Sequence, residues 1–266
     1  MENTNYNIAV VIDSDNISSK YLEILISELK GYGKISYKRI YGDFTTSEKQ
    51  SWKNIINEYG LIPVQQFSCI SGKNTTDFAL VIDVMDILYS KNVDCICIVS
   101  SDSDFNRLVT RLKENNIFVI GAGEAKSNKS FIKNYDRFIM LDKLFDLDSK
   151  AKKAEILADT TEEKIDKNAK DNKKEENIPQ LKSILKTVDK ILKEEDDDED
   201  GWAYLATVIQ KLYKEYPEFT PKLYGSSNIR EMFKKSGRYE LKETSKKQAN
   251  DSPMIRIKEK NKKIQK

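Results

Sequence analysis

The chain has 266 residues and a formal net charge of +2. Hydrophobic residues make up 39% of it and charged residues 33%. This polar composition indicates a folded part accompanied by solvated segments. It contains no histidine, which excludes His-ligated zinc sites and nucleophiles activated by an imidazole. Its three cysteines are too few for a disulfide framework and wrongly spaced for zinc, and Cys95 and Cys97 are expected in the core. No secretory segment and no run of about 18 apolar residues occurs, so we expect a cytoplasmic protein without membrane contact.

Apolar strands alternate with amphipathic helices through the first part of the chain. Residues 8–12 form an unbroken apolar run, which is typical of a strand buried on both faces. A helix follows, capped by Ser18 or Ser19 and ended by Gly31. This alternation predicts an α/β fold with a parallel, Rossmann-like sheet and right-handed crossovers. The other strands are expected at residues 35–41, 61–67, 93–99, 117–120 and 138–141, and the other helices at residues 52–59, 75–88 and 105–112.

The composition changes between residues 149 and 177. Lysines and acids alternate there and large apolar residues almost vanish, so no apolar stripe is left to bury. We therefore expect a charged linker, with the first domain covering residues 1–148.

Apolar periodicity returns after this segment and predicts a second, small domain at residues 178–260. It is large enough to fold alone, and residues 261–266 would follow it as a basic tail. We expect helices at residues 181–192, 202–212 and 229–233, and a β wing formed by residues 239–241 and 254–257.

Acidic residues follow the predicted strands at the edge where open α/β sheets bind their ligands. Asp13 and Asp15 come directly after the first strand, and Asp102 and Asp104 follow the strand at residues 93–99. Asp77 lies in the first turn of the helix after the third strand. Carboxylates gathered at one edge repel each other unless a cation lies between them, and oxygen-only donors favour Mg²⁺ or Mn²⁺. Such a site activates water and neutralises charge on a phosphodiester.

These polar residues also have structural interpretations. Asp15 or Asp104 can cap the helix after a strand, and Asn16 can hold water or a phosphate or merely close the turn. Asp83 lies on a different helical face from Asp77 and is the weaker candidate. The gathering of several acids at two strand ends and one helix start favours a functional site.

Three motifs carry a resemblance to a known family. They are Val-Val-Ile-Asp13-Ser-Asp15-Asn16, Lys73-Asn-Thr-Thr-Asp77 with Asp83, and Ser100-Ser101-Asp102-Ser-Asp104-Phe105. Together they resemble the NYN domain, a LabA-like family in the PIN-like nuclease group, which implies a Rossmann-like sheet whose acids bind divalent metal for RNA cleavage. A turn that required a positive φ at Ser101, where relatives usually have glycine, would be slightly strained. By position, the resemblance makes Asp13, Asp77, Asp102 and Asp104 the metal-binding and catalytic residues and gives Asp15 and Asn16 supporting roles. We also expect supporting roles for Ser101 and Asp83 and a nucleic-acid contact for Lys73.

The second domain carries its own resemblance. Gly201-Trp202 with Leu205, Tyr216-Pro217-Glu-Phe219-Thr-Pro221 and Gly237-Arg-Tyr239-Glu-Leu241 look like an OST-HTH (LOTUS) domain. That family implies a winged helix-turn-helix that binds RNA and, in some members, a protein partner. The acidic run at residues 194–200 is longer than expected and would repel phosphate. Seven basic residues are expected to line a phosphate-binding face: Lys211, Lys214, Lys222, Arg230, Lys234, Lys235 and Arg238. Taken singly, each of them can also be ordinary solvated surface.

Three functions compete at this level. The first is a metal-dependent endoribonuclease whose second domain binds single-stranded or structured RNA, in a protein that can form homo-oligomers. The second is a non-catalytic RNA-binding scaffold. The third is a phosphatase of the haloacid dehalogenase type, which Asp13-x-Asp15 after a first strand imitates, although Ile17 departs from that pattern and the Lys73–Asp77 segment stays unexplained.

Overall fold

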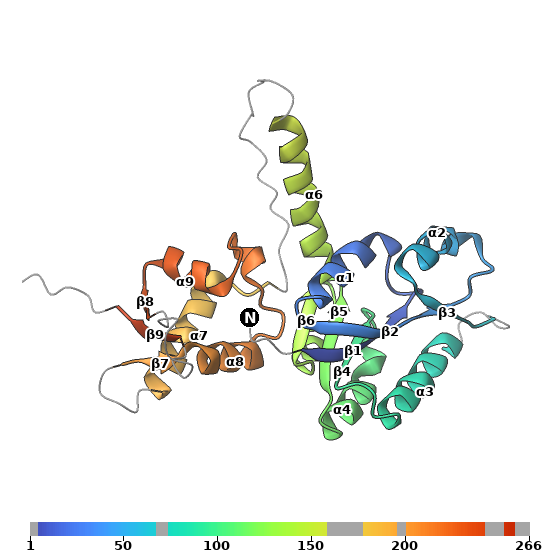
Figure 1. Ribbon diagram of the computed structural model, residues 1–266, viewed down its shortest axis with the longest axis horizontal. Helices are drawn as coiled ribbons and strands as arrows, with labels where there is room; N and C mark the ends of the chain where they lie inside the picture. The colour runs from blue at the N-terminus through green and yellow to red at the C-terminus, as the bar shows by residue number, and fades with distance from the viewer. Residues whose placement is uncertain (1–4, 68–73, 159–177, 196–200, 243–252, 259–266) are drawn as a thin grey trace, which may run out of the picture. The chain divides into compact units, whose positions relative to one another are not determined.

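The computed structural model describes residues 5–67, 74–158, 178–195, 201–242 and 253–258 (Figure 1). The chain divides into two compact units, Met1–Asn177 and Ile178–Lys266. In the described ranges, no helix has the length and apolarity needed to cross a lipid bilayer.

The first unit contains a six-stranded sheet in which every neighbouring pair is parallel. The strand order is β3-β2-β1-β4-β5-β6, so β1 and β4 are central and the chain winds outward from them in both directions. This is the order of a doubly wound sheet, which binds ligands where the winding reverses. The predicted α/β class is therefore confirmed. The strands are β1 Tyr6–Asp13, β2 Gly33–Gly42, β3 Ile62–Gln65, β4 Cys95–Val99, β5 Phe118–Gly123 and β6 Arg137–Met140.

Burial explains why the central strands are almost purely apolar. Residues 8–13 of β1 and all five residues of β4 are buried, as a strand covered by helices on both faces requires. Cys95 and Cys97 are free thiols with no exposed surface, so they fill the core as expected.

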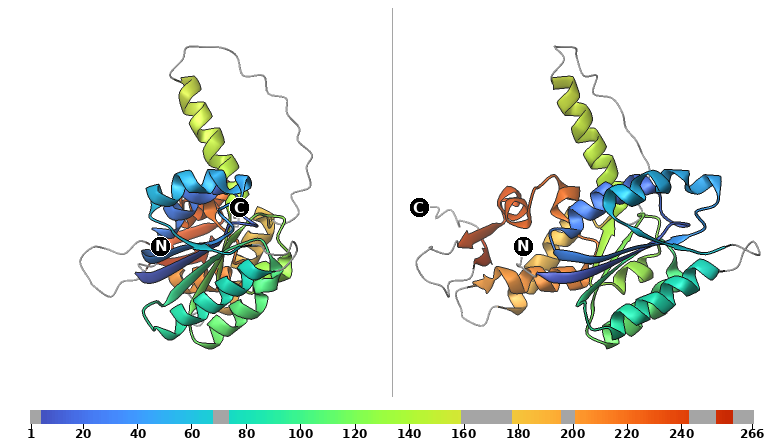
Figure 2. Two further views of the ribbon diagram at one scale, coloured as in Figure 1. Left: turned by 90° about the vertical axis from the view of Figure 1, so that its right-hand side faces the viewer. Right: turned by 45° about the vertical axis from the view of Figure 1, so that its right-hand side comes forward.

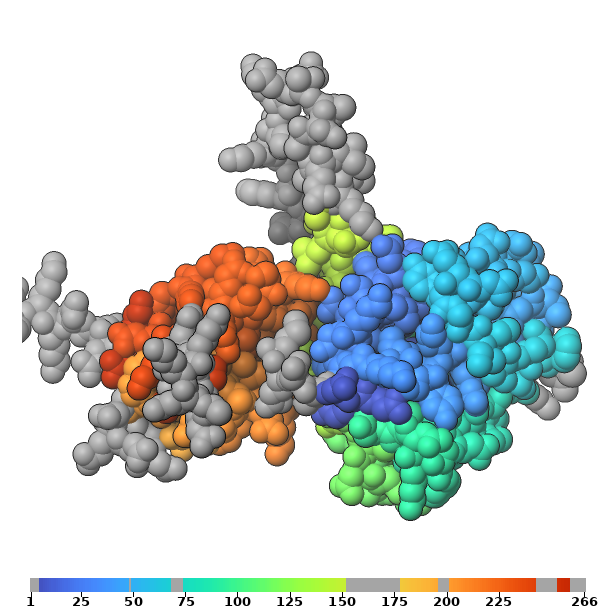
Figure 3. All heavy atoms as spheres, in the orientation of Figure 1, coloured from blue at the N-terminus to red at the C-terminus, as the bar shows by residue number. Residues whose placement is uncertain are grey.

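Helices cover both faces of this sheet. In Figures 1 and 2, α1, α2 and α6 lie on one face, and α3 and α4 lie on the other. The space-filling view shows the outer surface of α2 and α3 (Figure 3). The helices are α1 Leu22–Leu29, α2 Gln50–Tyr59, α3 Thr75–Tyr89, α4 Asn106–Glu114, α5 Lys129–Lys133 and α6 Leu141–Ala158, with short 3-10 turns η1 Ser19–Tyr21, η2 Ser47–Lys49 and η3 Ser103–Phe105.

Some local expectations need correction. Ser18 precedes the 3-10 turn η1, as a capping residue would, but its side chain makes no capping hydrogen bond. The predicted capping by the Ser18 side chain is therefore wrong. By contrast, Gly60 ends α2 in the left-handed conformation that glycine favours, with φ +61°. The helix α6 continues to Ala158 and so occupies the first ten residues of the segment expected to be a linker. Residues 159–177 lie outside the described part of the chain.

The second unit is a helical domain with a small sheet. The strands β7, β9 and β8 pair in that order and antiparallel, so the predicted wing of residues 239–241 and 254–257 is confirmed and gains a third strand. Trp202 was expected on the second helix but precedes it, next to β7. The elements are α7 Leu181–Glu194, β7 Ala203–Tyr204, α8 Leu205–Glu215, η4 Pro221–Tyr224, α9 Ile229–Ser236, β8 Tyr239–Lys242 and β9 Met254–Ile257.

One apolar core holds this second unit together. The core side chains of α7, α8 and α9 pack with Phe219, Tyr239 and Ile255. The Tyr239 hydroxyl, although buried, donates to the Leu185 carbonyl at 2.9 Å and contacts Asp189 Oδ1 at 2.7 Å. A buried hydroxyl with such partners fixes the wing against α7 without the cost of an unmade hydrogen bond.

Candidate active site

The carboxyl ends of β1 and β4 lie side by side. In the parallel register, Ile12 of β1 is paired with Val99 of β4, so the next residues, Asp13 and Ser100, meet at the same edge of the sheet. The winding of the sheet reverses between these two strands, and crossover loops leave a crevice at such a point. The predicted strand-end residues are therefore brought to the edge where the fold can bind a ligand.

Asp13 is the buried centre of this edge. Its side chain has no exposed surface, and both of its oxygens accept hydrogen bonds. Oδ1 accepts from the Asp15 amide at 3.0 Å, while Oδ2 accepts from Asn16 Nδ2 at 2.6 Å and from Ser100 Oγ at 2.9 Å. Burial raises the pKa of Asp13 above its ordinary value, and these hydrogen bonds oppose the rise without cancelling it.

The turn after β4 is tied to Asp13 through Ser100. Ser100 Oγ also accepts from the Asp102 amide at 3.1 Å, and Asp102 Oδ1 in turn accepts from the Asp104 amide at 2.9 Å. Asp102 therefore caps η3, whereas the sequence suggested that capping role for Asp104. The chain of hydrogen bonds fixes the backbone of this turn relative to β1.

Asp77 faces the same group of acids from α3. It lies in the first turn of that helix, where the helix dipole favours a negative charge. Its pKa is nevertheless raised to about 6, first by burial and then by the negative charges of Asp13, Asp102, Asp15 and Asp104. Four carboxylates from two other turns thus act on one side chain. Electrostatically, the five acids form one cluster.

This cluster fits a divalent cation by its chemistry. Its donors are carboxylate oxygens, and the pKa of Asp77 is raised first by burial and then by the charges of four other acids, so a bound cation would relieve part of this cost. Across the described residues, however, no three acids or cysteines stand together as a ready set of metal ligands. Mutual repulsion without a cation is a physical reason for carboxylates to stand apart.

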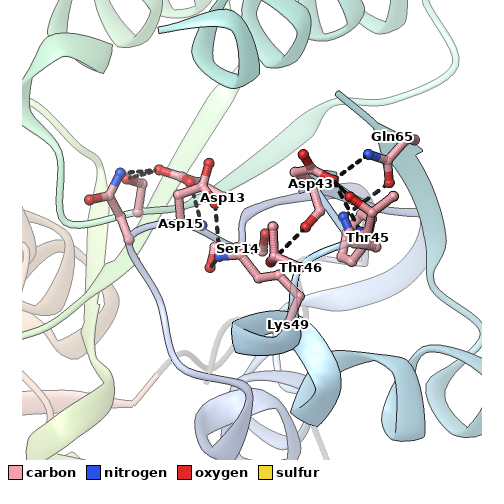
Figure 4. Close-up of polar contacts among 11 residues, drawn as sticks. Asp13, Ser14, Asp15, Asp43, Thr45, Thr46, Lys49 and Gln65 are labelled. Carbon is pink, nitrogen blue, oxygen red and sulfur yellow. Dashed lines mark hydrogen bonds and ion pairs between the residues drawn. The ribbon is translucent and has the colours of Figure 1, made fainter. Parts of the chain in front are cut away.

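Asp15 has a cationic partner at this edge. Lys49 Nζ lies 2.8 Å from Asp15 Oδ1 and also donates to the carbonyl oxygen of Ser14 (Figure 4). The Ser14 hydroxyl is buried against Gly42, and a Cβ at Gly42 would overlap it. Glycine at position 42 is thus required by the close approach of β2 to the turn that carries Asp13 and Asp15.

Two of the expected supporting residues contact other partners. The carboxylate of Asp83 accepts hydrogen bonds from Arg39 and Tyr41, and Asp83 is not among the acids that raise the pKa of Asp77. Ser101 Oγ accepts from the Glu124 amide at 3.0 Å. In the described segments, positive φ angles outside glycine occur at Lys91 and Asn116, so the strain considered for Ser101 does not arise.

Comparisons with known proteins agree with this geometry. The sequence profile of the NYN domain matches residues 7–142, half of the chain. The chain belongs to the NYN domain family. The profile of the OST-HTH/LOTUS domain matches residues 174–250, so the NYN domain is followed by an OST-HTH domain. NYN domains belong to the PIN-like nuclease superfamily, whose members typically use divalent metals such as Mg²⁺ or Mn²⁺.

Individual proteins add little to this family assignment. No curated protein matches the chain. A crystal structure of a protein of unknown function from Vibrio parahaemolyticus is similar at 18% identity and a TM-score of 0.44, covering 53% of this chain and 96% of that one.

Two residues of this site, Ser100 and Lys49, are not predicted from the sequence. Ser100 follows β4 as Asp13 follows β1, so the rule that selects Asp13 also applies to it. Asp43 directly follows β2, but its side chain accepts from the Thr45 amide and from Gln65 Nε2. Lys49 carries no comparable signal, because it lies 35 residues from Ser14 in a loop whose path the sequence does not reveal.

The OST-HTH domain brings several of its expected basic residues into ion pairs. Lys211 pairs with Glu195, Lys235 with Glu231, and Arg238 with Asp189. Lys214 and Arg230 are exposed. Each paired acid offsets the charge of its cation, so these pairs add less to the long-range attraction of phosphate than an unpaired cation would. Lys222 and Lys234 are also exposed, while Lys73, expected near the RNA, lies outside the described residues.

Proposed function

We propose that the NYN domain is a divalent-metal-dependent endoribonuclease and that the OST-HTH domain supplies RNA affinity. The observation that carries this proposal is that the acid-bearing turns after β1 and β4 meet at one edge of the sheet, where Ser100 Oγ donates to Asp13 Oδ2 at 2.9 Å and accepts from the Asp102 amide. The pKa of Asp77, raised to about 6 first by burial and then by the four acids of these turns, agrees with it. Unbalanced negative charge at the winding reversal of a doubly wound sheet is suited to a cation and, through it, to a phosphodiester.

In this proposal Asp13, Asp77, Asp102 and Asp104 hold Mg²⁺ or Mn²⁺. The ion would activate water and neutralise charge on the scissile phosphate. The protein's own contribution is orientation: Ser100 and Asn16 hold both the position and the rotamer of Asp13. Because the chain has no histidine, proton transfer falls to carboxylates and water.

The phosphatase interpretation has no support in this site. The profile that matches the segment carrying Asp13 and Asp15 is that of the NYN domain, a PIN-like nuclease family. We therefore do not propose a haloacid dehalogenase type of reaction.

The test is a cleavage assay on single-stranded and hairpin RNA with Mn²⁺, with Mg²⁺ and with EDTA. We expect cleavage with either ion and none in EDTA, and we expect Asp13→Asn and Asp102→Asn each to lower the rate about a hundredfold or more. Asp83→Asn is the matched control, because Asp83 is also a partly buried aspartate but pairs with Arg39. Its rate at a temperature where it stays folded should equal that of the wild type.

Two outcomes would overturn the proposal. One is cleavage that survives in EDTA or in the Asp13→Asn, Asp102→Asn double variant. The other is RNA binding without cleavage, together with no heat of Mn²⁺ binding in calorimetry, which would identify a non-catalytic RNA-binding scaffold. The same assay on DNA of the same sequence tests the choice of RNA as substrate.

A further inference from the structure

Lys49 is a lysine placed inside an acidic site. Its side chain is only 12% exposed, whereas that of its partner Asp15 is 46% exposed. The ammonium reaches across from η2 to the turn after β1, where it contacts Asp15 Oδ1 and the Ser14 carbonyl (Figure 4). A lysine held this closely has lost most of its side-chain entropy before any ligand arrives.

The loop that carries Lys49 is itself fixed. Asp43 Oδ1, at the end of β2, accepts from the Thr45 amide at 3.0 Å and from Gln65 Nε2 at 2.8 Å. Gln65 Oε1 accepts from the Phe44 amide at 3.0 Å, so β3 clamps the loop from its other side. Figure 4 shows this network beside the Asp13–Asp15 turn. The position of the ammonium is therefore set by the fold of β1, β2 and β3 together.

The contacts of Lys49 with other described residues leave one of its N–H donors for a ligand. An ammonium has three N–H donors, and Ser14 and Asp15 accept two of them. Asp15 is an exposed member of the acidic cluster, as is Asp104, so the Lys49–Asp15 pair lies beside the acids at a place that a phosphate can reach from solvent. A fixed cation at such a place attracts a phosphate and holds it at little further entropic cost.

We infer that Lys49 binds a phosphate oxygen of the substrate strand next to the scissile bond. This inference rests on the proposed function, because it takes nucleic acid as the ligand of the site. Asp15 then acts as the residue that positions the ammonium. A mere structural ion pair would tie η2 to the β1 turn without contacting RNA.

The chain contains a matched control for this distinction. Lys113 also pairs with an aspartate, Asp136, at 2.9 Å, and also donates to a backbone carbonyl, that of Asn134. It lies at the end of α4, near the amino ends of β5 and β6 and thus at the opposite edge of the sheet. Lys113→Met removes the same kind of contact and the same charge away from the acidic cluster.

The experiment compares full-length wild type, Lys49→Met, Lys49→Arg and Lys113→Met on a fluorescent single-stranded RNA of 12 nucleotides. Binding is measured in EDTA over a range of KCl concentrations, and single-turnover cleavage is measured with Mn²⁺. For Lys49→Met we expect about tenfold weaker half-saturation in cleavage. Its plots of log affinity and of log cleavage efficiency against log salt should be less steep by about 0.7, the value for one lost single-strand phosphate contact. Lys49→Arg should retain the wild-type slope, and Lys113→Met should match the wild type throughout.

Each outcome decides the inference. Equal salt slopes for Lys49→Met and Lys113→Met, with similar losses in melting temperature, would overturn it and leave a structural ion pair. If the wild type binds RNA but does not cut it, the proposed function fails while the salt slope in EDTA still tests Lys49. If Lys49→Met does not fold, the Lys49→Gln variant provides the same comparison.

Discussion

Ser100 joins the two central strands by donating a hydrogen bond from its hydroxyl to Asp13 Oδ2 at 2.9 Å. Ser100 is completely buried, and its oxygen also accepts from the Asp102 amide. One hydroxyl therefore couples the orientation of the buried acid to the backbone of the turn that carries the other acids.

Ser100→Ala should impair the site at both ends of this link. Loss of the hydroxyl leaves the Asp102 amide and Asp13 Oδ2 short of a partner and should lower the free energy of unfolding by about 1–3 kcal/mol. Because the Ser100 hydrogen bond lowers the pKa of Asp13, its removal should raise that pKa further and weaken Mn²⁺ binding at a given pH. Calorimetry with Mn²⁺ and denaturant unfolding measure the two effects. Ser103→Ala, an exposed serine in the same turn, should change neither.

Asp77→Asn should stabilise the metal-free protein at neutral pH. The pKa of Asp77 is about 6 in the folded protein, above the ordinary value of 3.8. Below pH 3.8 Asp77 is protonated in both states and the folded protein is not penalised. As the pH rises through 6 the side chain must ionise in the folded state, and this lowers the free energy of unfolding. In EDTA the variant should therefore melt at a higher temperature than the wild type at neutral pH, and the difference should vanish toward pH 3.8. Added Mn²⁺ should reverse the order, because the wild type keeps the ligand.

Asp86→Asn provides the control for this pH dependence. Asp86 is exposed on the same helix and does not contribute to the raised pKa of Asp77. A melting temperature of Asp77→Asn below that of the wild type at neutral pH in EDTA would contradict the cost of ionising Asp77 that its burial and the neighbouring acids imply.

Gly42→Ala should be rescued in part by a second substitution. The new Cβ would overlap the buried Ser14 hydroxyl, while Ser14 Cβ would lie 3.4 Å away, an ordinary contact. Gly42→Ala alone should destabilise the NYN domain by about 1–3 kcal/mol or more, both through the clash with Ser14 and because Gly42 has φ +158°, and Ser14→Ala should recover only the part of that loss that comes from the clash. Unfolding free energies of the four proteins of this cycle measure the coupling. Additive losses would contradict the packing described for this turn.

The OST-HTH domain should bind RNA through basic residues such as Lys214 and Arg230, which form no ion pair with another residue in the described part of the domain. The Lys214→Ala, Arg230→Ala double variant should flatten the salt dependence of RNA affinity by up to about 1.4, the value for two single-strand phosphate contacts. Lys211→Ala with Lys235→Ala removes the same charge from residues that pair with Glu195 and Glu231, and should have a smaller effect. Titrations at several salt concentrations make the comparison, and equal slopes for the two double variants would contradict it.

The sequence predicted those features that depend on local patterns. Unbroken apolar runs identified β1 and β4, and the strand-end rule brought Asp13 and Asp102 to one edge. The same rule would have found Asp43 if it had been applied to β2. The Lys49–Asp15 contact could not be predicted, because it depends on the path of a loop whose hydrogen bonds are set by Gln65 of another strand. The bounds of helix α6 could not be predicted, because the charged composition after residue 149 is typical of a solvated linker whether or not it is partly helical.

The separation in sequence between Asp13 and Ser100, 87 residues, has a consequence for the making of this protein. During synthesis β1 emerges early, but its buried aspartate has neither the β4 neighbour nor the serine hydroxyl until the chain has grown past residue 100. A nascent or truncated chain that stops short of β4 therefore has neither the serine that orients Asp13 nor the turn that carries Asp102 and Asp104.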